Sequence, residues 1–324
     1  MKTLICITTC NRLAYIKRYI WGYIDLCNKV NSFDFILSHD GFNQSYIDFC
    51  DEFDIPLIYS NDREGVGLSK NRVLKLFPNY NYYFFIEDDI EILDKYFFDL
   101  HINVSNIHNL PHLVCTSPRN IEKILKCDGY NLYFAKYGGA TSCFFKGEEL
   151  KKIGGWHPTF AKYRRFGHTE HTYRFYNASL LPAPFVVINK ARLFMIAHSP
   201  PSVSNVDNVE INMETHLLKE EEILINEKLI FFPVTTLSEF FFNDYSMSFN
   251  KKVDEFLRKN NRKYPFTKGR ERRIALAEHY FLRIRTTNNI VKKIFFFLKS
   301  ILYNPINLPF KHFIKTNLNR IILK

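Results

Sequence analysis

The chain carries an unusual segment, Tyr82-Tyr83-Phe84-Phe85-Ile86-Glu87-Asp88-Asp89-Ile90-Glu91-Ile92. Five apolar or aromatic residues lead directly into three consecutive carboxylates, and the apolar pattern then resumes. A buried strand would not hold such acids, because desolvating adjacent anions costs several kcal/mol each unless a cation neutralises them. A strand that ends in acids commonly presents ligands to a divalent metal in an α/β sheet. The segment therefore predicts a metal site, and the alternative is a strand followed by a solvated acidic turn.

The residues before this segment alternate between strand and helix patterns. Short apolar runs rich in β-forming residues occupy residues 4–8, 33–37, 56–59 and 82–86. Apolar residues at helical spacing occupy residues 14–27, 46–53 and 67–76. This alternation predicts an α/β fold with a mostly parallel, doubly wound central sheet and flanking helices. Ligands of such a sheet bind at the carboxyl ends of its strands.

Polar residues and glycines follow each of the four expected strands. In chain order the candidates are Thr8, Thr9, Asn11 and Arg12, then Asp40 and Gly41, then Arg63, Gly67, Lys70 and Asn71, then Glu87, Asp88 and Asp89. Taken singly these residues have ordinary explanations, because an Asp before a Gly is typical of a turn and a helical Lys is often only solvated. As a set at one edge of a sheet, they predict a binding site.

Composition restricts the class of protein. The 324 residues are 46% hydrophobic and 16% aromatic, which argues against a disordered or fibrous chain. Seven cysteines without paired spacing argue against a disulfide framework and a structural zinc site. The first apolar run is too short for a signal peptide, and no run reaches the roughly 18 apolar residues of a membrane span. The expected compartment is the cytoplasm.

The C-terminal part has a different character. Residues 1–230 are expected to form the α/β domain, and residues 231–324 a helical, basic region with helices at 237–280. Residues 282–324 hold nine Lys or Arg and no Asp or Glu, within a chain of net charge +11. Residues 290–303 mix lysines with a strongly apolar face, which is typical of a helix on an anionic membrane surface. The alternatives are a packed terminal helix or an oligomer contact. No reader motif indicates nucleic acid.

Taken in order, four motifs resemble those of the GT-A glycosyltransferases, most closely family 2. They are Thr8-Thr9-Cys10-Asn11-Arg12, Ser38-His39-Asp40-Gly41, the glycine-containing segment from Arg63 to Asn71, and Glu87-Asp88-Asp89 in place of the DxD motif. The resemblance covers roughly residues 3–200. It implies a GT-A fold and a nucleotide-sugar donor, most closely a UDP-sugar, with Asp40 holding the uracil. A Glu in place of the first Asp departs from the commonest family pattern.

The expected metal is Mn²⁺ or Mg²⁺, because a divalent ion held by one or two carboxylates can bridge the phosphates of a departing diphosphate. Asp89 is the first candidate ligand. Glu87 is expected to face the ribose or a metal-bound water, and Asp88 to point the opposite way. By the same resemblance, His198 occupies the place of a late histidine that completes the metal shell. A structural hydrogen bond is the alternative for His198.

The resemblance also covers the acceptor side. Gly138 and Gly139 lie in a segment similar to the strand beneath the donor sugar, where small residues leave room for a hexose. Trp156 follows Gly154-Gly155, and its indole can stack on a sugar ring or belong to the core. Glu170 occupies the E-D element, which supplies the general base of inverting enzymes. His171 stands where the family often has Asp, and an imidazole can also serve as the base. Residues 199–208 are expected to form a lid.

The resemblance therefore implies a metal-dependent, inverting hexosyl- or N-acetylhexosaminyltransferase. Its acceptor would be a glycan or a lipid-linked sugar in bacterial surface polysaccharide, lipopolysaccharide or capsule biosynthesis, on the cytoplasmic side and peripheral to the inner membrane. Two alternatives remain. A sugar-phosphate nucleotidyltransferase is disfavoured, because the chain lacks the N-terminal G-x-G-[ST]-R-like loop of that class. A non-catalytic module that binds a nucleotide or glycan for a partner would bind UDP without turnover.

Overall fold

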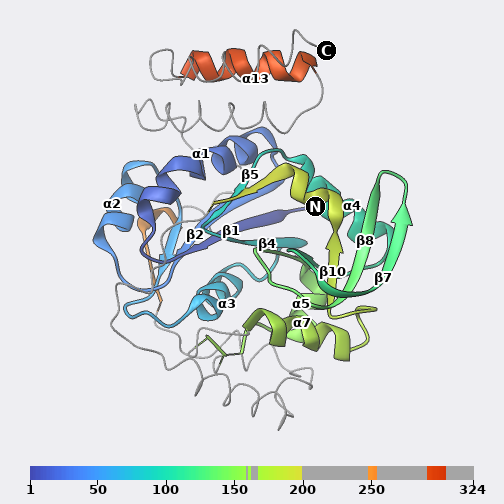
Figure 1. The fold of residues 1–324 in the computed structure, drawn as a ribbon. Helices are drawn as coiled ribbons and strands as arrows, with labels where there is room; N and C mark the ends of the chain where they lie inside the picture. Colours follow the sequence, from blue (N-terminus) through green and yellow to red (C-terminus); the bar gives the residue numbers. More distant parts are fainter. Residues whose placement is uncertain (158–159, 162–166, 199–246, 254–289, 304–324) are drawn as a thin grey trace.

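The computed structural model describes residues 1–157, 160–161, 167–198, 247–253 and 290–303 (Figure 1). Three expectations fall outside these residues. They are the domain boundary at residue 230, the lid at 199–208 and most of the helices at 237–280.

The fold is built on a ten-stranded sheet with helices on both faces (Figure 1). The strand order is β12 (Ser248–Phe249), β3 (Leu57–Tyr59), β2 (Phe33–His39), β1 (Thr3–Thr9), β4 (Tyr82–Glu87), β9 (Ser142–Lys146), β6 (His112–Cys115), β10 (Phe185–Ile188), β8 (Tyr130–Tyr137) and β7 (Arg119–Cys127). A separate two-stranded sheet pairs β5 (Ile90–Ile92) with β11 (Met195–Ala197), which follows the short 3-10 helix η1 (Asn189–Phe194).

Most strands of the large sheet run in one direction. β3, β2, β1 and β4 are parallel neighbours, and β6 and β10 continue in the same direction after the reversed strand β9. β8 and β12 are also reversed, and β7 is antiparallel to β8. The mostly parallel α/β sheet expected from the sequence is therefore confirmed, and each of the four expected N-terminal strands is present.

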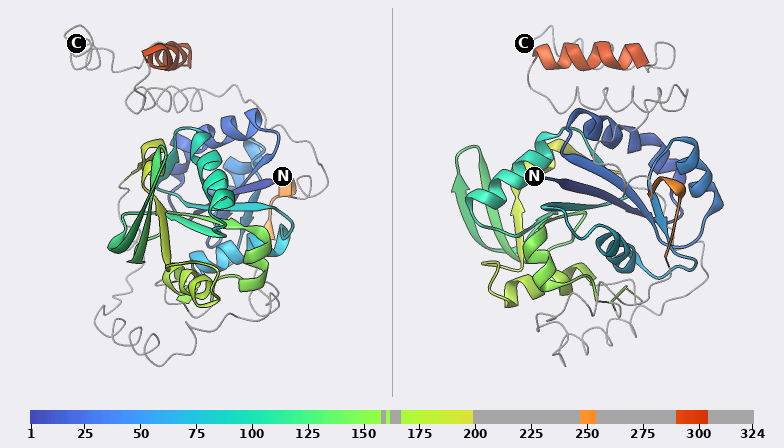
Figure 2. Two further views of the ribbon diagram at one scale, coloured as in Figure 1. Left: turned by 90° about the vertical axis from the view of Figure 1, so that its right-hand side faces the viewer. Right: turned by 180° about the vertical axis from the view of Figure 1, so that it is seen from behind.

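Helices cover both faces of the sheet (Figures 1 and 2). One face carries α1 (Leu13–Lys29), with α2 (Gln44–Glu52) packed beside it, and α4 (Tyr96–Ile107). The other face carries α3 (Val66–Leu76), α5 (Gly147–Ile153) and α7 (Gly167–Asn177). The remaining described helix, α13 (Ile290–Tyr303), lies beyond α1 in all three views.

The two covered faces explain the aromatic run of β4. The ring of Phe84 lies 4.9 Å from that of Phe98 in α4, whereas Phe85 on the opposite face lies 5.1 Å from Trp156. A strand covered on both faces reads as a continuous apolar run. The apolar run ends where the helices no longer cover the strand. Ile86 is fully buried, whereas the side chain of the next residue, Glu87, is 35% exposed. The acids therefore follow the strand at the open edge of the sheet.

Within the described part of the chain, no helix is both long enough and apolar enough to cross a bilayer.

Two buried histidines make the fold sensitive to acid. Burial lowers the pKa of His101 to about 4 and that of His112 to about 3. Since an unfolded histidine has a pKa of about 6.5, the unfolded state binds more protons below that pH. The free energy of unfolding should fall by up to about 1.4 kcal/mol per pH unit for each histidine as the pH falls from 6.5 towards the folded pKa.

Urea unfolding between pH 7 and pH 4.5 checks this expectation. His112→Gln should reduce the pH slope. An unfolding free energy that does not fall between pH 6.5 and pH 5 would contradict the assignment.

Candidate functional site

A pocket opens at the carboxyl ends of β1, β2 and β4, where the polar residues were expected to meet. Seven of the predicted residues line it, namely Thr8, Thr9, Arg12, Asp40, Arg63, Glu87 and Asp88. The other lining residues are Cys10, Gly65, Val66 and Ser69. The pocket therefore combines two guanidinium groups with three carboxylates.

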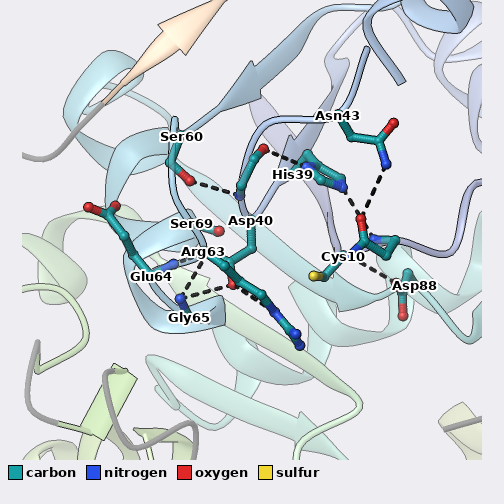
Figure 3. A network of polar contacts seen from close by, with 12 residues as sticks. Cys10, His39, Asp40, Asn43, Ser60, Arg63, Glu64, Gly65, Ser69 and Asp88 are labelled. Carbon is teal, nitrogen blue, oxygen red and sulfur yellow. Dashed lines mark hydrogen bonds and ion pairs between the residues drawn. The ribbon is translucent and has the colours of Figure 1, made fainter. Parts of the chain in front are cut away.

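Asp40 organises one wall of the pocket (Figure 3). Its carboxylate accepts hydrogen bonds from the backbone N–H groups of Glu64 at 2.8 Å and Gly65 at 2.9 Å. The guanidinium of Arg63 lies 3.9 Å from the same carboxylate. Asp40 therefore fixes the loop that enters α3 and places Arg63 at the rim. Each carboxylate oxygen can accept more than one hydrogen bond, so Asp40 can still bind a ligand.

Gly65 is required at its position in this loop. Its φ is +100°, and a Cβ there would lie 2.2 Å from the carbonyl oxygen of Ala161. Gly65→Ala should therefore lower the free energy of unfolding by about 2–4 kcal/mol, through backbone strain and a clash with backbone atoms that cannot easily move. Because Asp40 binds Gly65, nucleotide affinity should fall as well.

Gly129→Ala is the matched control. Gly129 also has a positive φ of +78°, but the nearest atom to its Cβ would be the flexible Lys190 ammonium at 3.7 Å. Chemical denaturation and UDP titration of both variants measure the two effects. Equal losses in the two variants would show that backbone strain, not the Ala161 contact, decides the outcome.

Asp88 organises the opposite wall. One carboxylate oxygen accepts hydrogen bonds from the Thr9 hydroxyl at 2.8 Å and the Cys10 N–H at 3.3 Å. The other binds the Arg12 guanidinium at 2.7 Å. Asp88 therefore closes the loop between β1 and α1 around the pocket. The side chain of Glu87 takes different partners, although both acids line the pocket and strand β4 already ends at Glu87.

His39 connects these two walls and was not among the predicted site residues. Its Nδ1–H donates to the carbonyl of Gly41 at 2.7 Å, and its Nε2 accepts from the N–H of Asn11 at 3.2 Å. The N–H of Gly41 in turn donates to the Ser60 hydroxyl at 2.8 Å (Figure 3). Burial lowers the pKa of His39, which keeps the ring neutral for this pair of contacts. Asn11 and Gly41 both have positive φ, of 53° and 104°.

The predicted residues of α3 lie behind the pocket. Gly67 packs against Trp156, and a Cβ there would lie 3.1 Å from the Cβ of that residue. The Asn71 amide exchanges two 2.8 Å hydrogen bonds with the Trp156 backbone. The Lys70 ammonium lies 5.0 Å from the indole centroid and 3.4 Å from His168. Trp156 is 1% exposed, so its ring is enclosed in the core.

Glu87 and His168 form a contact beside the pocket. The His168 Nε2 lies 3.3 Å from Glu87, and the two side chains are 21% and 35% exposed. Burial and the nearby Lys70 lower the pKa of His168, which favours the neutral imidazole that can accept a proton. His168 therefore brings α7 to the acidic edge of β4. The sequence predicts Glu170 and His171, the neighbours of His168 on α7, as the catalytic candidates instead.

Asp89 is the acid best suited to hold a cation. Its Oδ1 is buried without a hydrogen-bond partner, and burial together with Glu87 and Asp88 raises its pKa to about 6. A divalent ion would supply the missing partner and offset the repulsion between the acids. The residues present therefore fit the expected metal. No cluster of three protein ligands occurs in the described ranges, so phosphate or water oxygens would complete the shell.

His198 lies close to Asp89 but is held by another acid. Its backbone N–H donates to the Asp89 carbonyl at 2.7 Å. Its ring lies 3.0 Å from the buried carboxylate of Glu91 and stacks on Tyr19 at 5.1 Å between centroids. Glu91, the last acid of the segment at residues 82–92, therefore orients His198. The sequence signal for this acid was present, but it had no assigned role.

Glu170 and His171 are both enclosed in the core, and neither lines the pocket. Glu170 is 0% exposed and binds Arg174, whose Nε and Nη2 lie 2.5 Å and 2.9 Å from its carboxylate. Burial raises the pKa of Glu170, and the guanidinium opposes that rise. His171 is 1% exposed, stacks on Trp156 and binds the Gly154 carbonyl at 2.8 Å.

Gly138 and Gly139 lie between β8 and β9, beside Thr116. A Cβ at Gly138 would lie 3.0 Å from both Thr116 and Phe185, whereas at Gly139 the nearest atom would be the Thr116 hydroxyl at 3.3 Å. Small residues are therefore favoured here by the protein's own packing. The structure does not place either glycine in the pocket lining.

No family model matches the chain. A comparison with curated proteins found no match. Among solved structures the chain is similar to S. aureus TarS residues 1–349 in complex with UDP-GlcNAc, with 14% identity, coverage of 94% of this chain and 92% of that chain, and a TM-score of 0.48. It is also similar to the mannosyltransferase PcManGT from Pyrobaculum calidifontis in complex with GDP-Man and Mn²⁺, with 10% identity, coverage of 94% and 81%, and a TM-score of 0.43.

A further TarS structure shares 13% identity with a TM-score of 0.44, and the chain covers only 54% of its length. The architecture is an α/β fold with a mostly parallel central sheet, helices on both faces and a polar pocket at the carboxyl edge.

Proposed function

We propose that the chain is a metal-dependent glycosyltransferase that uses a nucleotide-sugar donor, most closely a UDP-sugar. The observation that supports this most is the buried, unpaired oxygen of Asp89, next to a pocket that also presents Arg12 and Arg63. A nucleoside diphosphate offers anionic phosphates to such guanidinium groups and hydrogen-bonding base edges to a carboxylate such as Asp40. A sugar nucleotide can therefore bind both the guanidinium groups and the carboxylates of this site.

Different residues of the site have different proposed roles in the transfer reaction. Arg12 and Arg63 would bind the diphosphate, Asp40 the base, and Thr8 and Thr9 would line the ribose side. Asp89 would hold Mn²⁺ or Mg²⁺, which supplies Lewis-acid stabilisation of the leaving diphosphate when bound. Glu87 and His198 are the further candidate ligands of that metal ion. In the proposed single displacement, an acceptor hydroxyl oxygen bonds to the anomeric carbon as the bond to the diphosphate breaks, with inversion.

The acceptor hydroxyl must lose its proton to a base in this step. Helix α7 supplies the candidates, and His168 has the most favourable position, because its ring lies at the acidic edge and is partly exposed. Glu170 or His171 could serve only after leaving Arg174 or Gly154. We therefore propose His168 as the base and Glu170 as a residue that fixes α7.

The acceptor is proposed to be a glycan or a lipid-linked sugar of bacterial surface polysaccharide, lipopolysaccharide or capsule, glycosylated on the cytoplasmic side. Gly138, Gly139 and Trp156 would support the sugar-binding part of the site by packing behind it. The Trp156 ring would not stack on the sugar. The transferred sugar is a hexose or an N-acetylhexosamine.

A donor panel tests the proposed function. UDP-, GDP- and CMP-sugars with Mn²⁺ should show donor hydrolysis for one nucleotide class, and chelation should remove it. UDP binding without hydrolysis or transfer across the panel would favour a non-catalytic binding module. Release of pyrophosphate from a nucleoside triphosphate and a sugar phosphate would instead identify a nucleotidyltransferase.

A further inference from the structure

Helix α13 has apolar residues on two opposite faces. Phe296 is 6% exposed and belongs to the main hydrophobic cluster, and Phe297 packs against that cluster. On the other face five large apolar side chains are between 51% and 76% exposed, namely Val291, Ile294, Phe295, Leu298 and Leu302. Their spacing of three, one, three and four residues places them in one stripe along the helix.

Lysines border this exposed stripe. The helix contains Lys292, Lys293 and Lys299 and no acidic residue. At 100° per residue, Lys292 and Lys299 fall on one flank of the stripe, and the Lys299 ammonium lies 5.0 Å from the ring of Phe295. Long lysine side chains can keep their charge in water while their stems cover an apolar surface. The stripe is therefore apolar at its centre and cationic at its edge.

The combination fits the surface of an anionic lipid bilayer. An in-plane helix buries its apolar face among the acyl chains while lysines contact the negative headgroups. The 14 residues of α13 span about 21 Å, which is enough to lie along the surface and too short to cross the roughly 30 Å hydrocarbon layer. The nine basic residues and absence of acids in residues 282–324 give the same charge complementarity over the surrounding sequence.

We propose that the stripe formed by Val291, Ile294, Phe295, Leu298 and Leu302 is a membrane-contact surface that binds anionic lipid through α13. This inference does not depend on the proposed transfer reaction, because it rests on the exposure of α13 and on the charge of residues 282–324. Together with that reaction, it would hold the pocket near an acceptor carried by a lipid.

Vesicle co-sedimentation of the full chain tests the proposal. Vesicles with about 30% phosphatidylglycerol should bind at least tenfold more protein than pure phosphatidylcholine vesicles, and the difference should shrink as salt rises. Phe295→Glu/Leu298→Glu should lower binding at least tenfold. Lys292→Gln/Lys299→Gln, which removes the two cations on the flank of the stripe, should lower it about 25-fold, because each cation near such a surface contributes about fivefold.

The matched control is Ile107→Glu/Ile124→Glu. It adds the same two charges at positions that are 70% and 50% exposed in α4 and β7, and it should leave vesicle binding within twofold of the parent after correction for net charge. Thermal unfolding shows whether each variant is folded. Donor hydrolysis in solution should be the same in all of them, so that loss of membrane binding is distinguishable from failure of the proposed function.

Three results would overturn the proposal. They are equal binding to neutral and anionic vesicles, no binding to either, and a dimer in analytical ultracentrifugation that Phe295→Glu/Leu298→Glu converts to monomer. The last result would assign the stripe to a second copy of the chain.

Discussion

Asp89→Asn is expected to lower the turnover of the nucleotide sugar at least about 1,000-fold, because the loss of metal-assisted stabilisation at the leaving diphosphate costs several kcal/mol. The same substitution should not destabilise the protein in the absence of metal. Asp89 is the acid whose buried Oδ1 has no partner, and burial, Glu87 and Asp88 all disfavour its charge. A neutral amide removes that repulsion. Loss of activity without loss of stability is the expected signature.

The measurement pairs initial rates with thermal unfolding in the presence of UDP, with and without Mn²⁺. Mn²⁺ should raise the melting temperature of the parent and have little effect on that of Asp89→Asn. Asp62→Asn is the control, since Asp62 is an exposed acid next to Arg63 and should behave as the parent does. Full activity of Asp89→Asn, or the same Mn²⁺ stabilisation as in the parent, would exclude Asp89 as a metal ligand.

The sequence predicted the parallel strands and the polar residues at their carboxyl ends better than it predicted which residues pack behind the pocket. Strand β4 could be recognised because its aromatic run ends at Glu87, where its cover of helices also ends. The positions of Thr9, Asp40 and Asp88 at one pocket follow from parallel strands ending at a common edge. The antiparallel insertion of β9 between β4 and β6 could not be predicted, because pairing of distant strands leaves no local pattern.

The positions of the residues behind the pocket could not be predicted from their motifs. Lys70, Asn71 and Trp156 belong to motifs of the expected kind, yet Lys70 and Asn71 both contact Trp156, and none of the three lines the pocket. A motif gives the order of residues along the chain but not which face of a helix is turned to the ligand. In α7 the pairing of Glu170 with Arg174 could be predicted, because the two residues are four apart and such pairs meet on one helix face.

Glu170→Ala is therefore expected to act chiefly on stability. It would leave the guanidinium of Arg174, which is 0% exposed, without its carboxylate, and breaking a buried pair on one side costs about 3–5 kcal/mol. A general base gives a different result, since its removal lowers turnover about 100- to 10,000-fold with the fold intact. The structure predicts the second result for His168→Gln, because the His168 side chain is partly exposed beside Glu87.

A double substitution separates the two roles of Glu170 without relying on an unstable variant. Glu170→Leu/Arg174→Met replaces both charges with apolar groups of similar size, and such replacements of buried pairs are often neutral or stabilising. Because the Arg174 guanidinium also donates to the carbonyls of Ile153 and Gly155, the double variant should unfold at a somewhat lower denaturant midpoint than the parent, but it should retain turnover within about tenfold of the parent's. A folded double variant with more than about a 100-fold loss of turnover would assign the base to Glu170 after all.

The comparison with His168→Gln completes the test, because both residues lie on α7 and differ mainly in what they face. His168 contacts Glu87 and Lys70 at the acidic edge, whereas Glu170 contacts Arg174 inside the core. If α7 supplies the base through His168, the turnover of His168→Gln should fall at all pH values while its melting temperature stays close to the parent's. Normal turnover of His168→Gln would move the proton acceptor elsewhere, and a Glu170 that swings out of the Arg174 pair would then be the remaining carboxylate on that helix.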